Sequence, residues 1–99
     1  MPLNWKVRIT DEASKVFESN LLSQDDKAII QTWAETVIRF GPEALLKHPN
    51  VWRDHELFDE WTGFRASSFS HVGRIIYRVE KKVVTVIVVR ISHDHNYKK

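Results

Sequence analysis

The feature that most constrains the fold is a run of nine residues, Val83–Ile91, with the sequence VVTVIVVRI. All of these residues except the arginine are β-branched, and β-branched side chains favour extended backbone. The run is too short to span a bilayer as a helix. The nearly continuous apolar character of residues 83–89 predicts a central strand that is covered on both faces. The rest of the chain must therefore supply its neighbouring strands and its cover.

Three further segments have strand patterns. Residues 64–69 and 74–79 are separated by a predicted turn at 70–73, and a second turn at 80–82 leads into the long run. Near the start of the chain, Trp5 to Ile9 alternates apolar and polar residues, as a half-buried strand does.

Two helices are expected between the first strand and the other three. Thr10 is followed by two acidic residues, which is a helix start signal, and the helix it predicts extends to Leu21. Ser23 repeats the signal, and residues 28–40 have one apolar stripe that ends at Gly41. The order predicts an α+β fold in a single domain, 1–99, with a small antiparallel sheet (β-α-α-β-β-β) and two helices packed on one face.

Composition supports a folded chain without disulfides. Of the 99 residues, 42% are hydrophobic, four are Trp and none is Cys, which excludes a disulfide scaffold, a thiolate metal site and thiol catalysis. Trp5, Trp33 and Trp61 are expected in the core, and Trp52 and Trp61 are expected to anchor the connection over residues 50–62. The first residues lack the features of a signal peptide, so we expect a cytoplasmic protein with no membrane partner.

Positive charge is concentrated in the C-terminal part of the chain. Residues 1–50 hold six Lys/Arg and seven Asp/Glu, a net charge of −1, whereas residues 61–99 hold eight Lys/Arg and two Asp/Glu, a net charge of +6. This asymmetry suits a polyanion such as nucleic acid, or an acidic protein partner. No Gly-rich phosphate loop, nucleophile elbow or carboxylate pair supports an ATPase, serine hydrolase or glycosidase.

Arginines gather on one face of the predicted sheet. A period of two places Arg74 and Arg78 on one face of their strand and Tyr77 on the other. Arg65 lies in the preceding strand, and Arg90 near the end of the long one. These residues are either ordinary solvated charges or a phosphate-binding cluster, since each guanidinium offers a planar fork of donors.

Histidines mark the end of the chain and two other positions. The terminal segment carries His93, His95 and Tyr97, which can transfer protons, hold a metal with Asp94 or His55, or form a solvated terminus. We expect no metal there, because no established ligand spacing is present. For His55 a structural role, held by an Asp or a backbone carbonyl, is favoured over a functional one, and His71 is expected to be exposed in a turn.

Particular motifs resemble those of a known family. The run Arg74-Ile75-Ile76-Tyr77 is similar to a signature of RelE- and YoeB-like toxins, and Asp54-His55-x-Leu57 with Trp61-x-Gly63-Phe64-Arg65 is similar to a stretch of YafQ-like toxins. The chain thus resembles the RelE/ParE superfamily of bacterial type II toxin–antitoxin toxins. Ser68 and Val72 stand where the YafQ-like stretch has a His and an Asp, so the identity of the general base stays open.

The resemblance implies a RelE-like fold and a ribosome-dependent endoribonuclease that needs no metal and no cofactor. Such enzymes cleave mRNA in the ribosomal A site through attack of the substrate 2′-OH. By this resemblance Arg74 and Arg90 stabilise transition-state charge, His93 or His95 transfers protons, and Tyr97 stacks on or orients a base. The expected RNA contacts are Arg65, His55, His71 and Arg78.

The implied partners are a cognate antitoxin, in a toxin–antitoxin hetero-oligomer, and mRNA on the ribosome beside rRNA. Two alternatives remain. The resemblance also allows a ParE-like inhibitor of DNA gyrase without catalysis, and the other alternative is a non-catalytic module that binds nucleic acid or protein.

Overall fold

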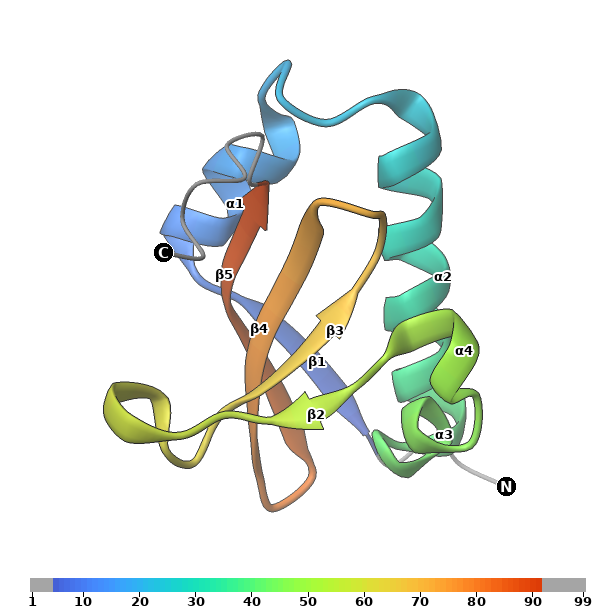
Figure 1. Cartoon of the computed structure of the whole chain (residues 1–99), viewed down its shortest axis with the longest axis vertical. Helices are drawn as coiled ribbons and strands as arrows, with labels where there is room; N and C mark the ends of the chain where they lie inside the picture. The colour runs from blue at the N-terminus through green and yellow to red at the C-terminus, as the bar shows by residue number, and fades with distance from the viewer. Residues whose placement is uncertain (1–4, 92–99) are drawn as a thin grey trace.

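The structure is a computed structural model and describes residues 5–91 (Figure 1). The elements follow one another as β1 (Lys6–Ile9), α1 (Asp11–Glu18), α2 (Gln24–Phe40), α3 (Glu43–Leu46), α4 (Pro49–Trp52), β2 (His55–Glu56), η1 (Asp59–Trp61), β3 (Arg65–Ser68), β4 (Gly73–Glu80) and β5 (Val83–Ile91). The predicted α+β order is confirmed, with two short helices, a 3₁₀ turn and a two-residue strand added in the connection before β3.

The sheet has five strands in the order β1-β5-β4-β3-β2. The internal position predicted for β5 is confirmed, because it lies between β1 and β4. The expectation of a wholly antiparallel sheet is wrong in one pair, since β1 runs parallel to β5. A parallel pair needs a long crossover, and the helical half of the chain supplies it.

The helix starts coincide with the capping residues seen in the sequence. The Thr10 side chain accepts a hydrogen bond from the backbone N–H of Ala13 at 3.2 Å, and Ser23 forms a reciprocal capping box with Asp26. Helix α2 ends at Gly41, whose φ of +84° favours glycine. Helix α1 ends at Glu18, before the predicted boundary, and leaves Leu21 exposed.

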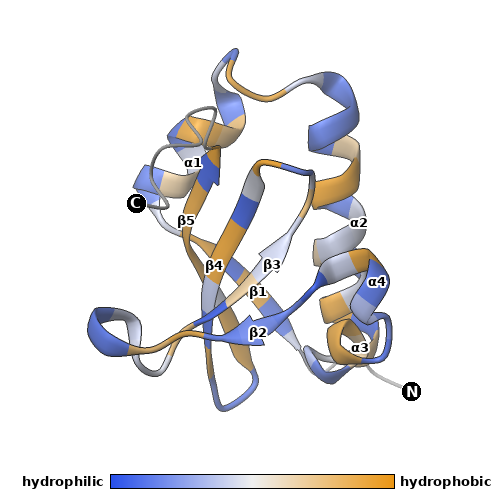
Figure 2. Ribbon diagram, viewed as in Figure 1, coloured by the Kyte–Doolittle hydropathy of each residue, from blue (hydrophilic) through white to orange (hydrophobic). Residues whose placement is uncertain are grey.

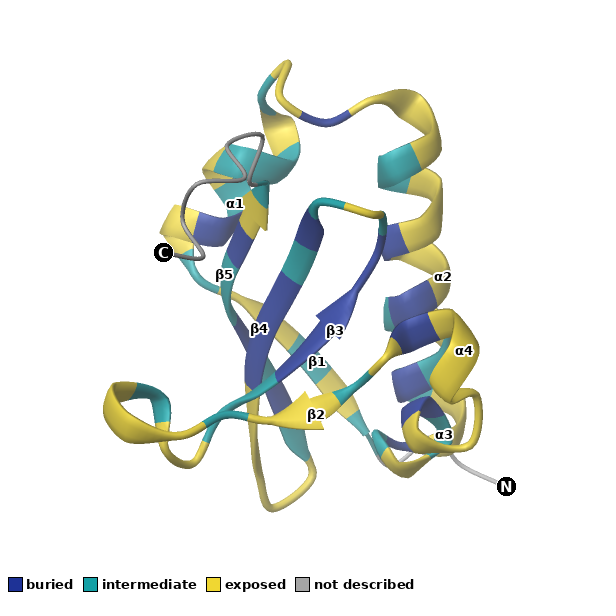
Figure 3. Cartoon of the chain, viewed as in Figure 1, coloured by how far each residue is buried: buried dark blue, intermediate teal, exposed yellow. Residues whose placement is uncertain are grey.

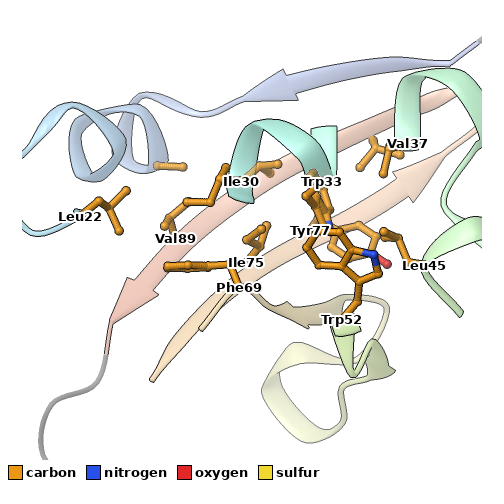
Figure 4. Close-up of a cluster of buried hydrophobic side chains, with 13 residues drawn as sticks. Leu22, Ile30, Trp33, Val37, Leu45, Trp52, Phe69, Ile75, Tyr77 and Val89 are labelled. Carbon is orange, nitrogen blue, oxygen red and sulfur yellow. The ribbon is translucent and has the colours of Figure 1, made fainter. Parts of the chain in front are cut away.

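The core lies between the helices and one face of the sheet. Figure 4 shows side chains of α2 pointing toward those of β4, and Trp33 packs edge-on against Tyr77 with ring centroids 5.2 Å apart. Both side chains are almost fully buried. Trp33 is thus a core residue as predicted, and Trp5 packs at the core's edge. Figure 2 shows β5 as largely hydrophobic and β2 as hydrophilic.

A β-bulge changes which way the end of β5 faces. Ile76 pairs with Val88 but Tyr77 pairs with Val86, so Ile87 is the extra residue. Before the bulge Val86 is buried against the helices, and after it Val89 is, so Arg90 faces the opposite side. The Thr10 hydroxyl donates to the carbonyl of Ile87 at 2.8 Å and thereby ties the bulge to the start of α1.

The face of the sheet opposite the helices, called here the open face, is only partly covered. Residues of β5 that face it, such as Thr85 and Val88, are half-buried, so complete cover of this strand on both faces is not observed. The segment between β2 and β3 extends away from the sheet and is largely exposed (Figures 1 and 3). No helix within residues 5–91 combines the length and hydropathy that a membrane crossing requires.

Candidate functional site

A groove on the open face brings two arginines and a histidine together. Arg74 on β4 and Arg90 on β5 are direct cross-strand partners. In the next row on the same face of the sheet, His55 of β2 lies opposite Ala66, which lies opposite Ile76. We call this cavity of about 210 Å³ the Arg74–Arg90 groove; it is lined by His55, Leu57, Trp61, Ala66, Arg74, Ile76 and Arg90.

The groove is positively charged and contains no acid. Its lining has no carboxylate, and the two ion pairs found within residues 5–91 join Arg65 to Asp54 and Arg78 to Glu80, so neither guanidinium of the groove is neutralised by them. Like charges placed directly opposite on neighbouring strands repel one another. A bound anion would relieve that repulsion and accept charge-assisted hydrogen bonds from both arginines.

The β3–β4 turn holds the side chain of Arg74 in place. Its Nη1 donates to the carbonyl oxygens of Gly73 at 2.9 Å, Ser70 at 3.3 Å and His71 at 3.4 Å. These bonds leave Nε and Nη2 without a partner among residues 5–91. The guanidinium is therefore positioned by the backbone and keeps donors for a ligand.

One ring nitrogen of His55 is held by the backbone. Its Nδ1 lies 2.9 Å from the carbonyl oxygen of Arg53, and since a carbonyl only accepts, this nitrogen carries the proton. In the neutral ring Nε2 then holds the lone pair and can accept a proton. The carbonyl contact agrees with the structural role favoured from sequence, and the same side chain also lines the groove.

A buried hydrogen-bond network fixes the chain just before His55. The side chain of Asp54 is fully buried and accepts from Arg65 Nε at 2.7 Å, from Ser67 Oγ at 2.5 Å and from Tyr77 Oη at 2.5 Å. Trp33 Nε1 in turn donates to Ser67 Oγ at 3.0 Å. The network joins α2, β3 and β4 to the start of β2.

Two members of this network have altered acidity. Burial and the hydrogen bond to the Asp54 carboxylate raise the pKa of Tyr77 far above its ordinary value. Burial lowers the pKa of Arg65, but its hydrogen bond and charge interaction with Asp54 outweigh this and raise it overall. Arg65 is therefore committed to Asp54 and does not line the groove.

The other predicted site residues lie in different places. Arg78, exposed on the same strand as Arg74, lines a separate cavity with Arg8. His71 is exposed in the β3–β4 turn, as expected, and lines a cavity on the far side of Arg74. His93, His95 and Tyr97 lie outside the described residues. The alternative of a metal site formed by His93 and His95 with Asp94 or His55 also lies outside them, except for His55. Within residues 5–91 no three His, Cys, Asp or Glu side chains form a metal-binding group.

Sequence reasoning missed two residues of this region. Trp61 was expected in the core, but it is only partly buried, packs edge-on against Phe64 at 5.4 Å and lines the groove. Its position beside two acidic residues in a polar segment was a signal against core burial. Arg53 was not singled out, although its carbonyl orients His55 and its side chain lines the cavity that contains His71.

Comparison with known proteins gives matches by structure alone. No protein-family model matches the chain, and no curated protein shows significant similarity to it. Several solved structures share the fold, among them the following three. The YoeB–YefM toxin–antitoxin complex from Staphylococcus aureus has a TM-score of 0.70 at 12% identity over 90% of this chain and 98% of that one. YafQ from E. coli has a TM-score of 0.70 at 20% identity over 89% and 93% of the two chains.

The third is the archaeal RelE–RelB complex from Pyrococcus horikoshii OT3, with a TM-score of 0.70 at 17% identity over 90% of this chain and 96% of that one. At these identities the likeness establishes architecture. The chain has the α+β fold of the RelE/ParE toxins, and the resemblance drawn from its motifs is confirmed at the level of the fold.

Proposed function

We propose that this protein is the toxin of a type II toxin–antitoxin pair and that it cleaves mRNA in the ribosomal A site. The observation that carries the proposal is the Arg74–Arg90 groove, in which two guanidiniums without an acidic partner among residues 5–91 lie beside the imidazole of His55. The fold shared with YoeB, YafQ and RelE supports it.

The reaction needs a base, an acid and a cationic cradle. The 2′-OH loses its proton and its oxygen bonds to the adjacent phosphorus, while the bond from phosphorus to the 5′-oxygen breaks and that oxygen gains a proton. The products are a 2′,3′-cyclic phosphate and a 5′-OH end. The nucleophile belongs to the RNA, so the protein's contribution is proton transfer and charge stabilisation.

We assign roles to Arg74, Arg90 and His55 by their position in the groove, and to His93, His95 and Tyr97 by the resemblance alone. Arg74 and Arg90 stabilise the negative charge that grows on the phosphorane oxygens. His55, with Nε2 able to accept, takes the 2′-OH proton, and His93 or His95 protonates the leaving 5′-oxygen. We propose that Tyr97 stacks on or orients a nucleobase of the RNA.

An antitoxin is the proposed protein partner. Two of the three structures described above are complexes, YoeB–YefM and RelE–RelB. Because residues 61–99 carry a net charge of +6, we expect an acidic or amphipathic antitoxin segment to cover the groove in a hetero-oligomer in the cytoplasm.

The test uses purified protein on programmed ribosomes. Primer extension should reveal cuts in A-site codons, with 2′,3′-cyclic phosphate on the upstream fragment. The double variant Arg74→Ala/Arg90→Ala should make no cuts and cause no growth arrest, whereas Arg39→Ala, which removes one exposed positive charge from α2, should behave as the wild type. Protein that leaves the mRNA intact but inhibits DNA supercoiling by gyrase would overturn the proposal in favour of a ParE-like toxin.

A further inference from the structure

A second cavity, which the proposed reaction does not use, adjoins Arg74. We call this space of about 290 Å³ the turn pocket; it is lined by Asn50, Val51, Arg53, Ser68, Phe69, Ser70, His71 and Arg74. We propose that it is a second phosphate subsite, which holds the phosphodiester next to the one bound between Arg74 and Arg90. The inference rests on the proposed function, because it takes the ligand to be RNA.

The lining of the turn pocket suits a phosphate. Its lining residues include Arg53, Arg74 and His71, which carry two guanidiniums and an imidazole, and Ser68 and Ser70, which carry hydroxyls. No carboxylate lines it, and neither ion pair found within residues 5–91 involves Arg53. Such a set suits an anion, which it can bind through charge-assisted bonds, and it has no carboxylate that would attract a cation.

The backbone of Arg53 gives independent support. This residue ends α4 with φ +49° and ψ +40°, in the left-handed region, where a non-glycine residue costs about 1–2 kcal/mol. Its N–H donates to the carbonyl of Pro49 at 3.1 Å, and its own carbonyl holds His55. Glycine would meet these backbone needs with less strain, so an arginine at this position suggests a use for its exposed side chain.

The register of the sheet connects the turn pocket to the groove. Ser68, Arg74 and Arg90 form one row across β3, β4 and β5, because Ser68 is the direct partner of Arg74 and Arg74 that of Arg90. Ser68 lines the turn pocket, Arg90 lines the groove, and Arg74 lines both. Two anions would therefore lie on either side of one guanidinium, which suits consecutive phosphates of one strand.

The experiment compares uncleavable ligands that differ by one phosphate. A 2′-O-methyl dinucleotide, with a single phosphodiester, is titrated against the full chain beside the same dinucleotide carrying a 5′- or a 3′-terminal phosphate. The wild type should bind one of the phosphorylated forms about tenfold more tightly than the plain dinucleotide, as charge-assisted hydrogen bonds from an arginine allow.

Arg53→Met should remove this gain and leave affinity for the plain dinucleotide unchanged. His71→Gln, at an exposed turn position, should reduce the gain in part, and Arg39→Met, which loses the same charge elsewhere, should retain it in full. Equal binding of all three ligands by the wild type, or a full gain in a folded Arg53→Met variant, would overturn the second subsite alone. Failure of the wild type to bind any of the three would overturn the proposed RNA site as well.

Discussion

Arg74 and Arg90 are direct partners across the antiparallel pair β4–β5, with no carboxylate in the cavity that they line. Two like charges in this position destabilise the free protein and favour the protein bound to an anion. The groove is therefore a place where stability and binding are opposed.

Removing one of these charges should stabilise the protein while it weakens binding. Arg90→Gln is expected to raise the free energy of unfolding by about 0.2–1 kcal/mol, the usual size of a cross-strand pair effect, and to abolish RNA cleavage. Urea unfolding at low salt measures the first effect. The matched control is Arg78→Gln, since Arg78 lies opposite Thr85, and it should give no such gain. A lower stability for Arg90→Gln would contradict the repulsion argument.

The hydroxyl of Thr10 should affect the groove from the other end of the chain. Thr10→Val removes the α1 cap and the bond to the Ile87 carbonyl, so we expect a loss of about 1 kcal/mol together with weaker RNA binding as Arg90 shifts. Ser23→Ala removes the comparable cap of α2, whose hydroxyl accepts from the N–H of Asp26 within the same helix. It should cost similar stability with unchanged binding, and equal binding losses in both variants would count against the coupling.

Asp54 should be among the least replaceable residues. Asp54→Ala leaves Arg65, Ser67 and Tyr77 without their shared acceptor, and removal of one partner from a buried ion pair costs about 3–5 kcal/mol. Thermal and urea unfolding measure the loss. Glu35→Ala, an exposed acid on α2, should change stability by no more than about 0.5 kcal/mol.

Gly73 should tolerate no side chain. A Cβ at this position would lie 2.3 Å from Cζ of the buried Phe69 ring, so Gly73→Ala must displace the ring or the turn that positions Arg74. We expect a cost of about 1–3 kcal/mol, as for other overpacked cores, and reduced cleavage. Adding Phe69→Leu should recover part of both losses. Wild-type stability in the single variant would show that the ring moves freely.

The phenol of Tyr77 should make stability depend on alkaline pH. Its pKa is raised in the folded protein, so stability is full below the unfolded-state pKa of about 10 and falls as pH rises above that value, where only the unfolded chain ionises. Urea unfolding between about pH 9 and 11 measures this slope. Tyr77→Phe should have a lower free energy of unfolding at neutral pH and a shallower alkaline decline.

Much of the fold followed from local patterns. The bounds of β5 and the caps at Thr10 and Ser23 were visible because turn chemistry, β-branching and capping act between near neighbours. The parallel pairing of β1 and the two-residue strand β2 were not, since both depend on which strands meet after the chain has folded.

The site was predictable only in part. Period two along β4 correctly separated Arg74 from Tyr77, but the same period along β5 would place Arg90 on the face of the buried Val86, and only the bulge reverses this. The sequence around Asp54 does not indicate that its carboxylate is the centre of a buried hydrogen-bond network, because its partners lie up to 23 residues away along the chain. His93 and His95 remain predictions.

The three-residue spacing of Arg74 and Tyr77 puts the two on opposite sides of β4, one in the groove and one in the core. The run from Arg74 to Tyr77 is thus subject to two separate selective pressures, one on the groove through Arg74 and one on the stability of the core through Tyr77. A gene copy released from selection for the proposed activity can lose the arginine at little cost to folding, whereas loss of the tyrosine removes a core ring and a partner of Asp54. Inactivated descendants of such a protein should therefore keep the tyrosine long after the arginine has drifted.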